Sequence, residues 1–219
     1  MKHICLFVLF LSFWTPGFSQ NADIDLLNHI HSKRNERLDP TLKWITNSVK
    51  PLSLAVPAGT AAFALITKDD QSLQDAVEIS STVLVSGLLS VGLKYAVNRD
   101  RPFETYPFIK AVTPTHTPSF PSGHTTHAFA LATAVSLAFQ EWYVAVPAYL
   151  WAGTVGYTRM ALGVHYPSDV LAGMIIGSGT AFLSHKINQK IREKHGGLKF
   201  SNGIPGNEYV LFRLVIPLE

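Results

Sequence analysis

Five long uncharged stretches dominate the pattern of hydrophobic and polar positions along the chain. They run over residues 51–67, 79–93, 125–140, 142–158 and 170–185. Each is 15 to 17 residues long and rich in Ala, Leu, Val, Gly and Ser, which is too long and too evenly apolar for a strand. The pattern therefore predicts an all-α fold, a bundle of five to six core helices.

A more polar stretch, 23–50, precedes the first of these runs. Its apolar residues are spaced among charges as in amphipathic helices that lie on a surface, and Asp39-Pro40 marks a break or a helix start. At the other end of the chain, residues 209–217 are apolar and strand-like, and they follow a turn region rich in Gly, Asn and Pro.

The first 20 residues have the pattern of an export signal. Lys2 precedes an apolar run over 4–14, and Gly17-Phe18-Ser19 offers small residues for cleavage. An uncleaved membrane anchor would show the same pattern. The single cysteine, Cys5, lies in this segment, so a processed chain would have neither a cysteine nucleophile nor cysteine-bound zinc. We divide the chain into 1–20, a helical domain over 21–199 and a tail over 200–219.

The five runs leave the location of the protein open between two alternatives. A membrane-spanning helix needs about 20 apolar residues, so the runs are short for a membrane. Trp44, Trp142 and Tyr157 would extend them as interfacial anchors. Gly173 and Gly177 form a GxxxG pair, which permits close helix contact in lipid and also occurs in soluble cores. We favour an inner-membrane protein; the alternative is a soluble periplasmic domain.

The charges that follow the last run predict an orientation for the membrane alternative. Export of the N-terminus followed by five crossings places the C-terminal tail inside. Basic residues are enriched on the inner side of membrane proteins, and against the single Glu193 this tail carries Lys186, Lys190, Arg192, Lys194 and Lys199. Segments 94–124 and 159–169 would then share the outer, periplasmic face.

Composition narrows the class of protein further. The chain has 219 residues, which suits one domain, and only 15% of them are charged whereas 47% are hydrophobic. This balance excludes a disordered chain and a coiled coil. The net charge of +3 gives no reason to expect a nucleic-acid partner. The modest mean hydropathy of +0.18 keeps the soluble alternative open.

Three short segments carry the residues suited to chemistry, and each alone has an ordinary structural explanation. Residues 94–102 fit a basic helix end that stops before proline, 120–125 a tight turn that starts a helix, and 158–169 a helix cap. The turn at 120–125 also presents backbone N–H groups as an anion site. Asp169 follows His165 by four residues, so in a helical turn its carboxylate can reach one imidazole nitrogen.

Together the three segments are more specific than any one of them. They bring three cations, a set of N–H donors, two histidines and a carboxylate to helix ends on one predicted face. Such a set binds a tetrahedral oxyanion and performs phosphoryl transfer without a metal, because that reaction depends mainly on positioning and charge neutralisation.

The motifs K-x6-RP, PSGH and (S/T)R-x5-H-x3-D resemble those of the type 2 phosphatidic acid phosphatase superfamily. That superfamily includes membrane lipid phosphatases, bacterial class A acid phosphatases and vanadium haloperoxidases. Every core position matches in order and spacing, and the one departure is Thr158, where serine is usual.

The resemblance implies a two-step reaction that needs no cofactor. His165 would attack phosphorus to form a phosphohistidine, while Asp169 orients its ring and stabilises its charge. His124 would protonate the leaving oxygen and then activate water. The residues implied to hold the phosphate oxygens are Lys94, Arg101, Ser122, Gly123 and Arg159.

The resemblance also limits the class of substrate. We expect a phosphorylated lipid such as undecaprenyl pyrophosphate, phosphatidylglycerophosphate, phosphatidic acid or lipid A. A soluble periplasmic acid phosphatase of broad specificity is the main alternative. A vanadium haloperoxidase and a purely structural bundle are the others, although nothing indicates a halide-handling region and no core position is lost. The sequence selects neither one lipid nor an oligomeric state.

Several polar residues lie beside the motifs without matching them. We predict a local ion pair for Arg99 and Asp100, a rim or lid for the loop 113–119 with His116, and a core or rim position with satisfied hydrogen bonds for His127. No metal site is expected, because three further histidines have no partners at metal-ligand spacing: His29, His31 and His185.

Overall fold

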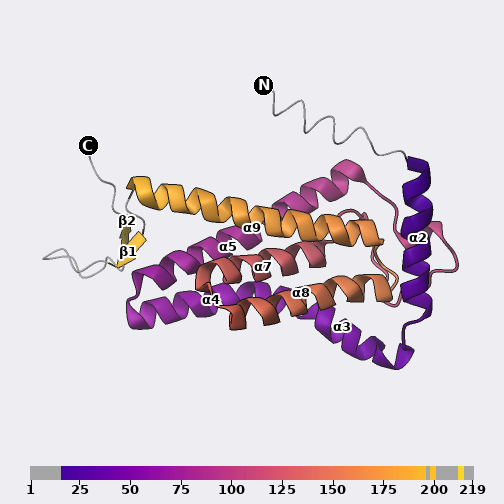
Figure 1. The fold of residues 1–219 in the computed structure, drawn as a ribbon, viewed down its shortest axis with the longest axis horizontal. Helices are drawn as coiled ribbons and strands as arrows, with labels where there is room; N and C mark the ends of the chain where they lie inside the picture. Colours follow the sequence, from indigo (N-terminus) through magenta and orange to yellow (C-terminus); the bar gives the residue numbers. More distant parts are fainter. Residues whose placement is uncertain (1–15, 196–197, 201–211, 215–219) are drawn as a thin grey trace, which may run out of the picture.

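The bundle is built from five long helices in a computed structural model that describes residues 16–195, 198–200 and 212–214. Helix α7 packs against all four of the others, and the predicted all-α bundle is confirmed (Figure 1). The five are α4 (Val49–Thr67), α5 (Asp70–Val97), α7 (Gly123–Phe139), α8 (Trp142–Ala161) and α9 (Pro167–His195).

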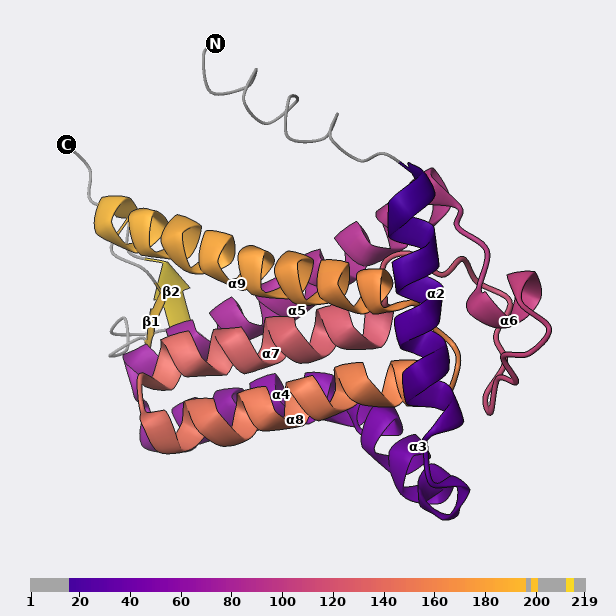
Figure 2. The ribbon, with the colours of Figure 1, turned by 45° about the vertical axis from the view of Figure 1, so that its right-hand side comes forward.

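Shorter elements cover the two ends of this bundle. Helix α2 stands across the end where α8 finishes and α9 begins, and it contacts both (Figure 2). The strand-like pattern of 209–217 is confirmed only for β2, and most of the predicted export signal lies outside the described residues. The shorter elements are α2 (Pro16–Ser32), η1 (Glu36–Leu38), α3 (Asp39–Asn47), α6 (Pro102–Thr105), and the antiparallel pair β1 (Leu198–Phe200) and β2 (Phe212–Leu214).

Helix α5 begins well before the apolar run that predicted it. Asp69 caps its first turn, because the carboxylate accepts hydrogen bonds from the backbone N–H groups of Gln71 and Ser72 at 3.4 and 2.9 Å. The first turns also bury Glu78, which is satisfied by His185 of α9 at 2.6 Å. The pattern missed these turns because their polar groups find partners on another helix.

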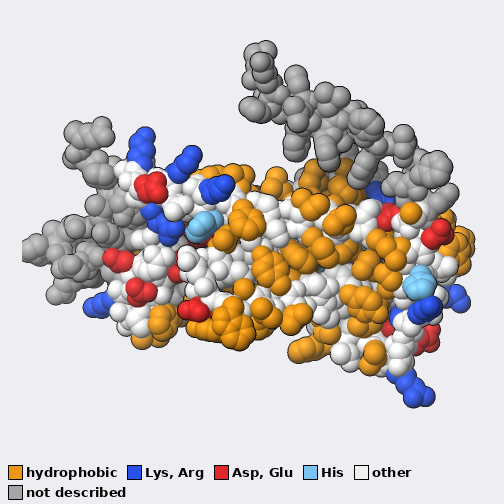
Figure 3. Space-filling view, viewed as in Figure 1, with side chains coloured by type: hydrophobic (Ala, Val, Ile, Leu, Met, Phe, Trp, Pro, Cys, Tyr) orange, Lys and Arg blue, Asp and Glu red, His pale blue; other side chains and the backbone are white. Residues whose placement is uncertain are grey.

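On the face seen in Figure 3, hydrophobic side chains cover the middle of the bundle, and charged side chains gather at its two ends. Three helical stretches are long and apolar enough to cross a membrane: 36–67, 70–105 and 167–194. Large hydrophobic side chains on these stretches are exposed, for example Leu84 at 64% and Ile175 at 63%. Exposed apolar surface of this extent indicates a membrane-embedded protein.

The GxxxG pair allows α9 to approach the backbone of α7 closely. A Cβ atom added at Gly173 would lie 2.9 Å from the carbonyl oxygen of Ser122, and one added at Gly177 would overlap the carbonyl of Thr126. The predicted close helix contact is therefore confirmed. It holds the start of α9 beside the start of α7, where two of the chemically suited segments lie.

Gly177→Ala is expected to destabilise the bundle by about 1–3 kcal/mol, because the added methyl group forces two backbones apart. Gly179→Ala is the matched control on the same helix, since nothing lies within 4 Å of the added Cβ. Thermal unfolding in detergent would compare the two variants. Equal melting temperatures would show that the α7–α9 contact is not tight.

Candidate active site

The three chemically suited segments meet in one cavity of about 670 Å³ at the end of the bundle near α2. The first segment begins in the last turn of α5, the second starts α7, and the third joins α8 to α9. Six of the eight predicted site residues line the cavity: Lys94, Arg101, Gly123, His124, Arg159 and His165. The structure therefore brings them together, whereas Ser122 and Asp169 lie behind the wall.

His165 is held in one orientation by groups on both sides of its ring. Its Nδ1 lies 3.4 Å from Oδ2 of Asp169, which confirms the predicted reach from i to i+4. Its Nε2 lies 3.3 Å from Nη1 of Arg101. A guanidinium only donates hydrogen bonds, so this contact requires a lone pair on Nε2 and places the proton on Nδ1. The nitrogen that carries the lone pair is the one next to the cavity's cations.

Burial keeps this imidazole neutral. His165 is 2% exposed, and desolvation lowers its pKa to about 3, although Asp169 acts in the opposite direction. The ring therefore loses its second proton well below neutral pH and keeps only the one on Nδ1. A neutral imidazole with its lone pair on Nε2 is the nucleophilic form.

The titration of His165 can be observed directly. We expect its ¹³Cε1 resonance, in detergent-solubilised protein labelled on histidine, to stay constant between pH 8 and pH 5. The resonance would be identified by its loss in His165→Ala. A midpoint near the ordinary value of about 6.5 would contradict the burial argument.

Asp169 is fully buried, and three groups besides His165 donate hydrogen bonds to its carboxylate. Ser119 Oγ donates to Oδ2 at 2.5 Å, the backbone N–H of Tyr166 donates to the same oxygen at 3.0 Å, and Arg99 Nη1 donates to Oδ1 at 2.7 Å. These contacts leave the carboxylate no freedom to turn away from the imidazole. Sequence reasoning missed Ser119, because only the fold brings it to Asp169.

Arg99 bridges two buried carboxylates, so the predicted local ion pair with Asp100 is wrong. Its Nη2 lies 2.7 Å from Oδ2 of Asp23 on α2, and its Nη1 lies 2.7 Å from Asp169. The guanidinium also stacks over Tyr166 at 3.8 Å from the ring centroid. Asp23 in turn accepts hydrogen bonds from the backbone N–H and the hydroxyl of Ser168. Helix α2 is thus connected to the site.

The three motif cations are held by neutral groups. Lys94 Nζ donates to the carbonyl of Pro118 at 2.6 Å, and Arg101 donates to the carbonyls of Thr117 and Val164, both at 2.7 Å. Arg159 Nη1 donates to Oγ1 of Thr46 at 2.9 Å, and its buried Nε has no partner. No carboxylate pairs with these three among the described residues, so the cavity keeps a positive charge that suits an anion.

The start of α7 contributes its backbone and His124, whereas the Ser122 hydroxyl points elsewhere. Ser122 is fully buried and its Oγ lies 2.9 Å from Oγ1 of Thr125. Gly123 lies against the first segment, since an added Cβ would be 3.8 Å from Cε of Lys94. Thr158 donates to the carbonyl of Val155 and does not line the cavity.

Of the two other histidines near the site, one lines the cavity and the other does not. His127 lines the cavity, which agrees with the predicted rim position, but the prediction that its hydrogen bonds are satisfied is wrong, because its buried Nδ1 has no partner among the described residues. His116 is exposed and does not line the cavity, although Thr113, Thr115 and Thr117 of the same loop do. Within the described parts of the chain, no group of three or more metal-ligating side chains stands together.

Two known proteins that this chain resembles are named as phosphatases. A lipid A 1-phosphatase of Rhizobium johnstonii is 41% identical over 109 residues, which are 47% of this chain and 43% of that protein. An undecaprenyl-diphosphatase of Sulfolobus acidocaldarius is 32% identical over 115 residues, 50% of this chain and 55% of that protein. The chain thus matches about half the length of these curated relatives.

Solved structures and a family profile extend the likeness. The crystal structure of Aquifex aeolicus LpxE superposes with a TM-score of 0.64 and 27% identity, covering 75% of this chain and 95% of that one. The profile of the PAP2 superfamily matches residues 75–193, which contain the motif histidines, the three motif cations and Asp169. By this match over more than half its length, the chain belongs to the PAP2 superfamily.

Proposed function

We propose that the chain is a metal-independent phosphatase of membrane lipids that carry a phosphate or diphosphate headgroup, acting through a phosphohistidine at His165. One observation carries the proposal: a neutral imidazole, fixed by Asp169, presents its Nε2 lone pair beside unneutralised cations. That arrangement suits attack on a phosphorus atom whose oxygens need charge neutralisation.

The first step forms one bond and breaks another. Nε2 of His165 attacks phosphorus, and the bond from phosphorus to the leaving oxygen breaks as the N–P bond forms. His124 gives a proton to that oxygen; since burial lowers its pKa to about 3 in the empty cavity, this proton must arrive with the substrate, whose negative charge favours the imidazolium. The positive charge that develops on the His165 ring is stabilised by the carboxylate of Asp169, which is already ionised through its contacts with Arg99 and Ser119.

The second step returns the site to its starting state. Water gives a proton to His124 and attacks phosphorus, and the N–P bond breaks with release of inorganic phosphate. Lys94, Arg101, Arg159 and the backbone at Gly123 hold the phosphate oxygens in both steps. The position of the Ser122 hydroxyl supports a role for this residue in starting α7, with its backbone rather than its side chain near the phosphate.

A lipid substrate is supported by the surface around the bundle. The cavity is lined by residues at one end of the bundle, beyond the apolar middle, so a lipid headgroup can bind there while its chains stay in the membrane. The basic residues in the last turns of α9 lie at the opposite end of the long bundle, which supports an orientation with the cavity on the periplasmic face. We place the catalytic unit within 21–199.

The test is phosphate release by the full chain in detergent with a metal chelator present. A lipid pyrophosphate and a soluble phosphomonoester would be compared side by side, together with partition of the protein between membrane and aqueous fractions. We expect release from the lipid and recovery in the membrane fraction. Preference for the soluble ester by protein in the aqueous fraction would favour a periplasmic acid phosphatase, and loss of activity with chelator would contradict metal independence.

A further inference from the structure

The cavity has a wall that the catalytic motifs do not supply. It is formed where the end of α3 meets the start of α4, by Thr46, Asn47, Val49, Lys50 and Pro51. All five precede residues 75–193, the segment that matches the family profile. A volume of about 670 Å³ is within the range of pockets that hold whole small ligands, so it exceeds the needs of one phosphate group.

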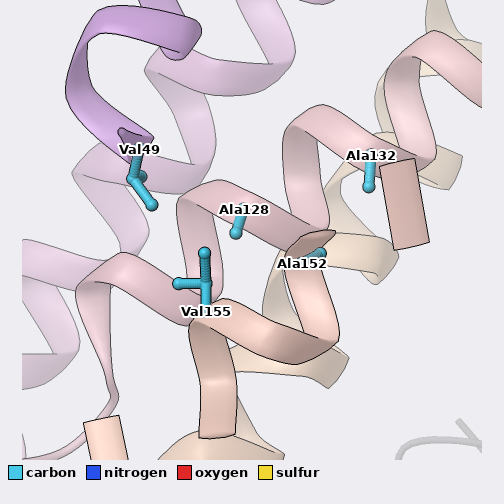
Figure 4. Close-up of a cluster of buried hydrophobic side chains, with 5 residues drawn as sticks. All are labelled: Val49, Ala128, Ala132, Ala152 and Val155. Carbon is cyan, nitrogen blue, oxygen red and sulfur yellow. The ribbon is translucent and has the colours of Figure 1, made fainter. Parts of the chain in front are cut away.

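Two contacts fix the position of this wall. Thr46 is buried and its Oγ1 accepts the hydrogen bond from Arg159 of the phosphate cradle. Val49 packs against Ala128 of α7 and Val155 of α8 in a buried cluster (Figure 4). Helices α3 and α4 run on almost without a break, since the N–H of Leu52 donates to the carbonyl of Ser48.

These contacts hold the backbone that carries Lys50 at the cavity, which Lys50 lines. Thr46 and Lys50 are four residues apart, so they share one helix face, and that face is the one turned to Arg159. The charge of Lys50 acts on His124 of the facing helix α7. Lys50 and His124 line the same cavity, so a cation stands in the space where the leaving oxygen would take its proton.

Lys50 differs from the other cations of the cavity in its lack of partners. Lys94, Arg101 and Arg159 each donate hydrogen bonds to protein groups. Within the described ranges, Lys50 has no hydrogen-bond or ion-pair partner. The neighbouring His127 also lines the cavity with a buried Nδ1 that no described group satisfies. Lys50 is exposed, so its ammonium is free to pair with an anion in the cavity, whereas the buried Nδ1 of His127 is an unpaired atom that a ligand can complete.

We infer that Lys50, with Asn47 and His127, forms a second anion subsite that binds the leaving phosphate of a lipid diphosphate. This inference rests on the proposed phosphatase function and names its substrate class. His165 attacks the terminal phosphorus, the bridging P–O bond breaks, and the departing lipid monophosphate takes the proton of His124. A cation beside the leaving group stabilises the charge that grows there in the transition state.

A matched pair of substrates tests the subsite: farnesyl diphosphate and farnesyl monophosphate, which differ only in the second phosphate. The wild-type chain is expected to prefer the diphosphate and to release one phosphate from it, leaving the monophosphate. Lys50→Gln is expected to lower kcat/KM for the diphosphate by about tenfold or more, the size of one lost charge-assisted hydrogen bond, and for the monophosphate by less than about twofold.

Two further variants separate the subsite from a general charge effect. Lys43→Gln on α3 removes a cation that does not line the cavity, and it should leave both substrates unchanged. Lys50→Arg keeps the charge and should retain most of the preference for diphosphate. Thermal unfolding of each variant in detergent would show that the fold persists.

The outcomes distinguish this inference from the proposed function. An equal loss on both farnesyl substrates, or no loss on either, would overturn the subsite while leaving the phosphatase intact. A loss confined to lipid A, which carries two separate monophosphates, would place the second anion away from the leaving oxygen and would also overturn it. A wild-type chain inactive on every lipid would instead contradict the proposed function.

Discussion

His165→Ala is expected to lower phosphate release by about ten-thousandfold or more while the bundle stays folded. The variant removes the imidazole that attacks phosphorus in the proposed mechanism, and loss of a nucleophile has effects of this size in other enzymes. The fold should persist, because Asp169 keeps its hydrogen bonds from Ser119, Arg99 and the Tyr166 N–H.

The intermediate can be measured together with the rate. Acid-quenched protein that has turned over a ³²P-labelled substrate should carry acid-labile phosphate in the wild type and none in His165→Ala. His124→Ala, given an aryl phosphate whose leaving group needs no proton, should accumulate the phosphoenzyme because water is no longer activated. His116→Ala is the matched histidine control, because His116 is exposed and does not line the cavity. Labelled His165→Ala protein would rule out His165 as the nucleophile.

Arg99→Ala is expected to reduce both stability and turnover, because Arg99 lies between two buried carboxylates. Asp169 is fully buried and Asp23 is 8% exposed, so the variant leaves two negative charges without their shared cation. Breaking a buried pair costs about 3–5 kcal/mol. We expect the lower end of that range, since Arg99 is itself 27% exposed and hydroxyl and N–H donors remain.

The catalytic part of this effect acts through position. Asp169 without Arg99 can shift by a fraction of an ångström, and His165 turns with it; a misplacement of about 1 Å costs about a hundredfold in rate. We therefore expect kcat to fall by about a hundredfold at a temperature where the variant is folded, with a much smaller change in KM. A fall in stability with unchanged kcat would limit Arg99 to a structural role.

A second substitution tests the bridge itself. Asp23→Asn in the Arg99→Ala background removes one of the two uncompensated charges, so the double variant should be more stable than Arg99→Ala alone. Arg99→Lys should restore little, because a single ammonium cannot hold two carboxylates in the geometry of a guanidinium fork. Additive effects of Arg99→Ala and Asp23→Asn would show that the two residues do not interact.

The parts of this protein that follow from local spacing could be predicted from the sequence. Helices α4, α7 and α8 coincide closely with uncharged runs, because a helix of this length must be apolar to be buried or to face lipid. The reach from Asp169 to His165 follows from the geometry of one helical turn, and the three motif segments end helices on one side of the bundle. The same local reasoning placed the start of α5 too late, since it could not see His185 beside Glu78.

Only the tertiary structure decided which residues support those motifs. Arg99 binds Asp23 and Asp169, Ser119 holds Asp169, and Thr46 holds Arg159, all across long stretches of chain. Nothing in their local sequence indicates these partners, because a contact between distant segments depends on how helices pack and on the small residues that let α9 approach α7. The sequence by itself determined the chemistry of the motifs and the class of fold; packing determined the orientation of His165 and the additional cavity wall that carries Lys50.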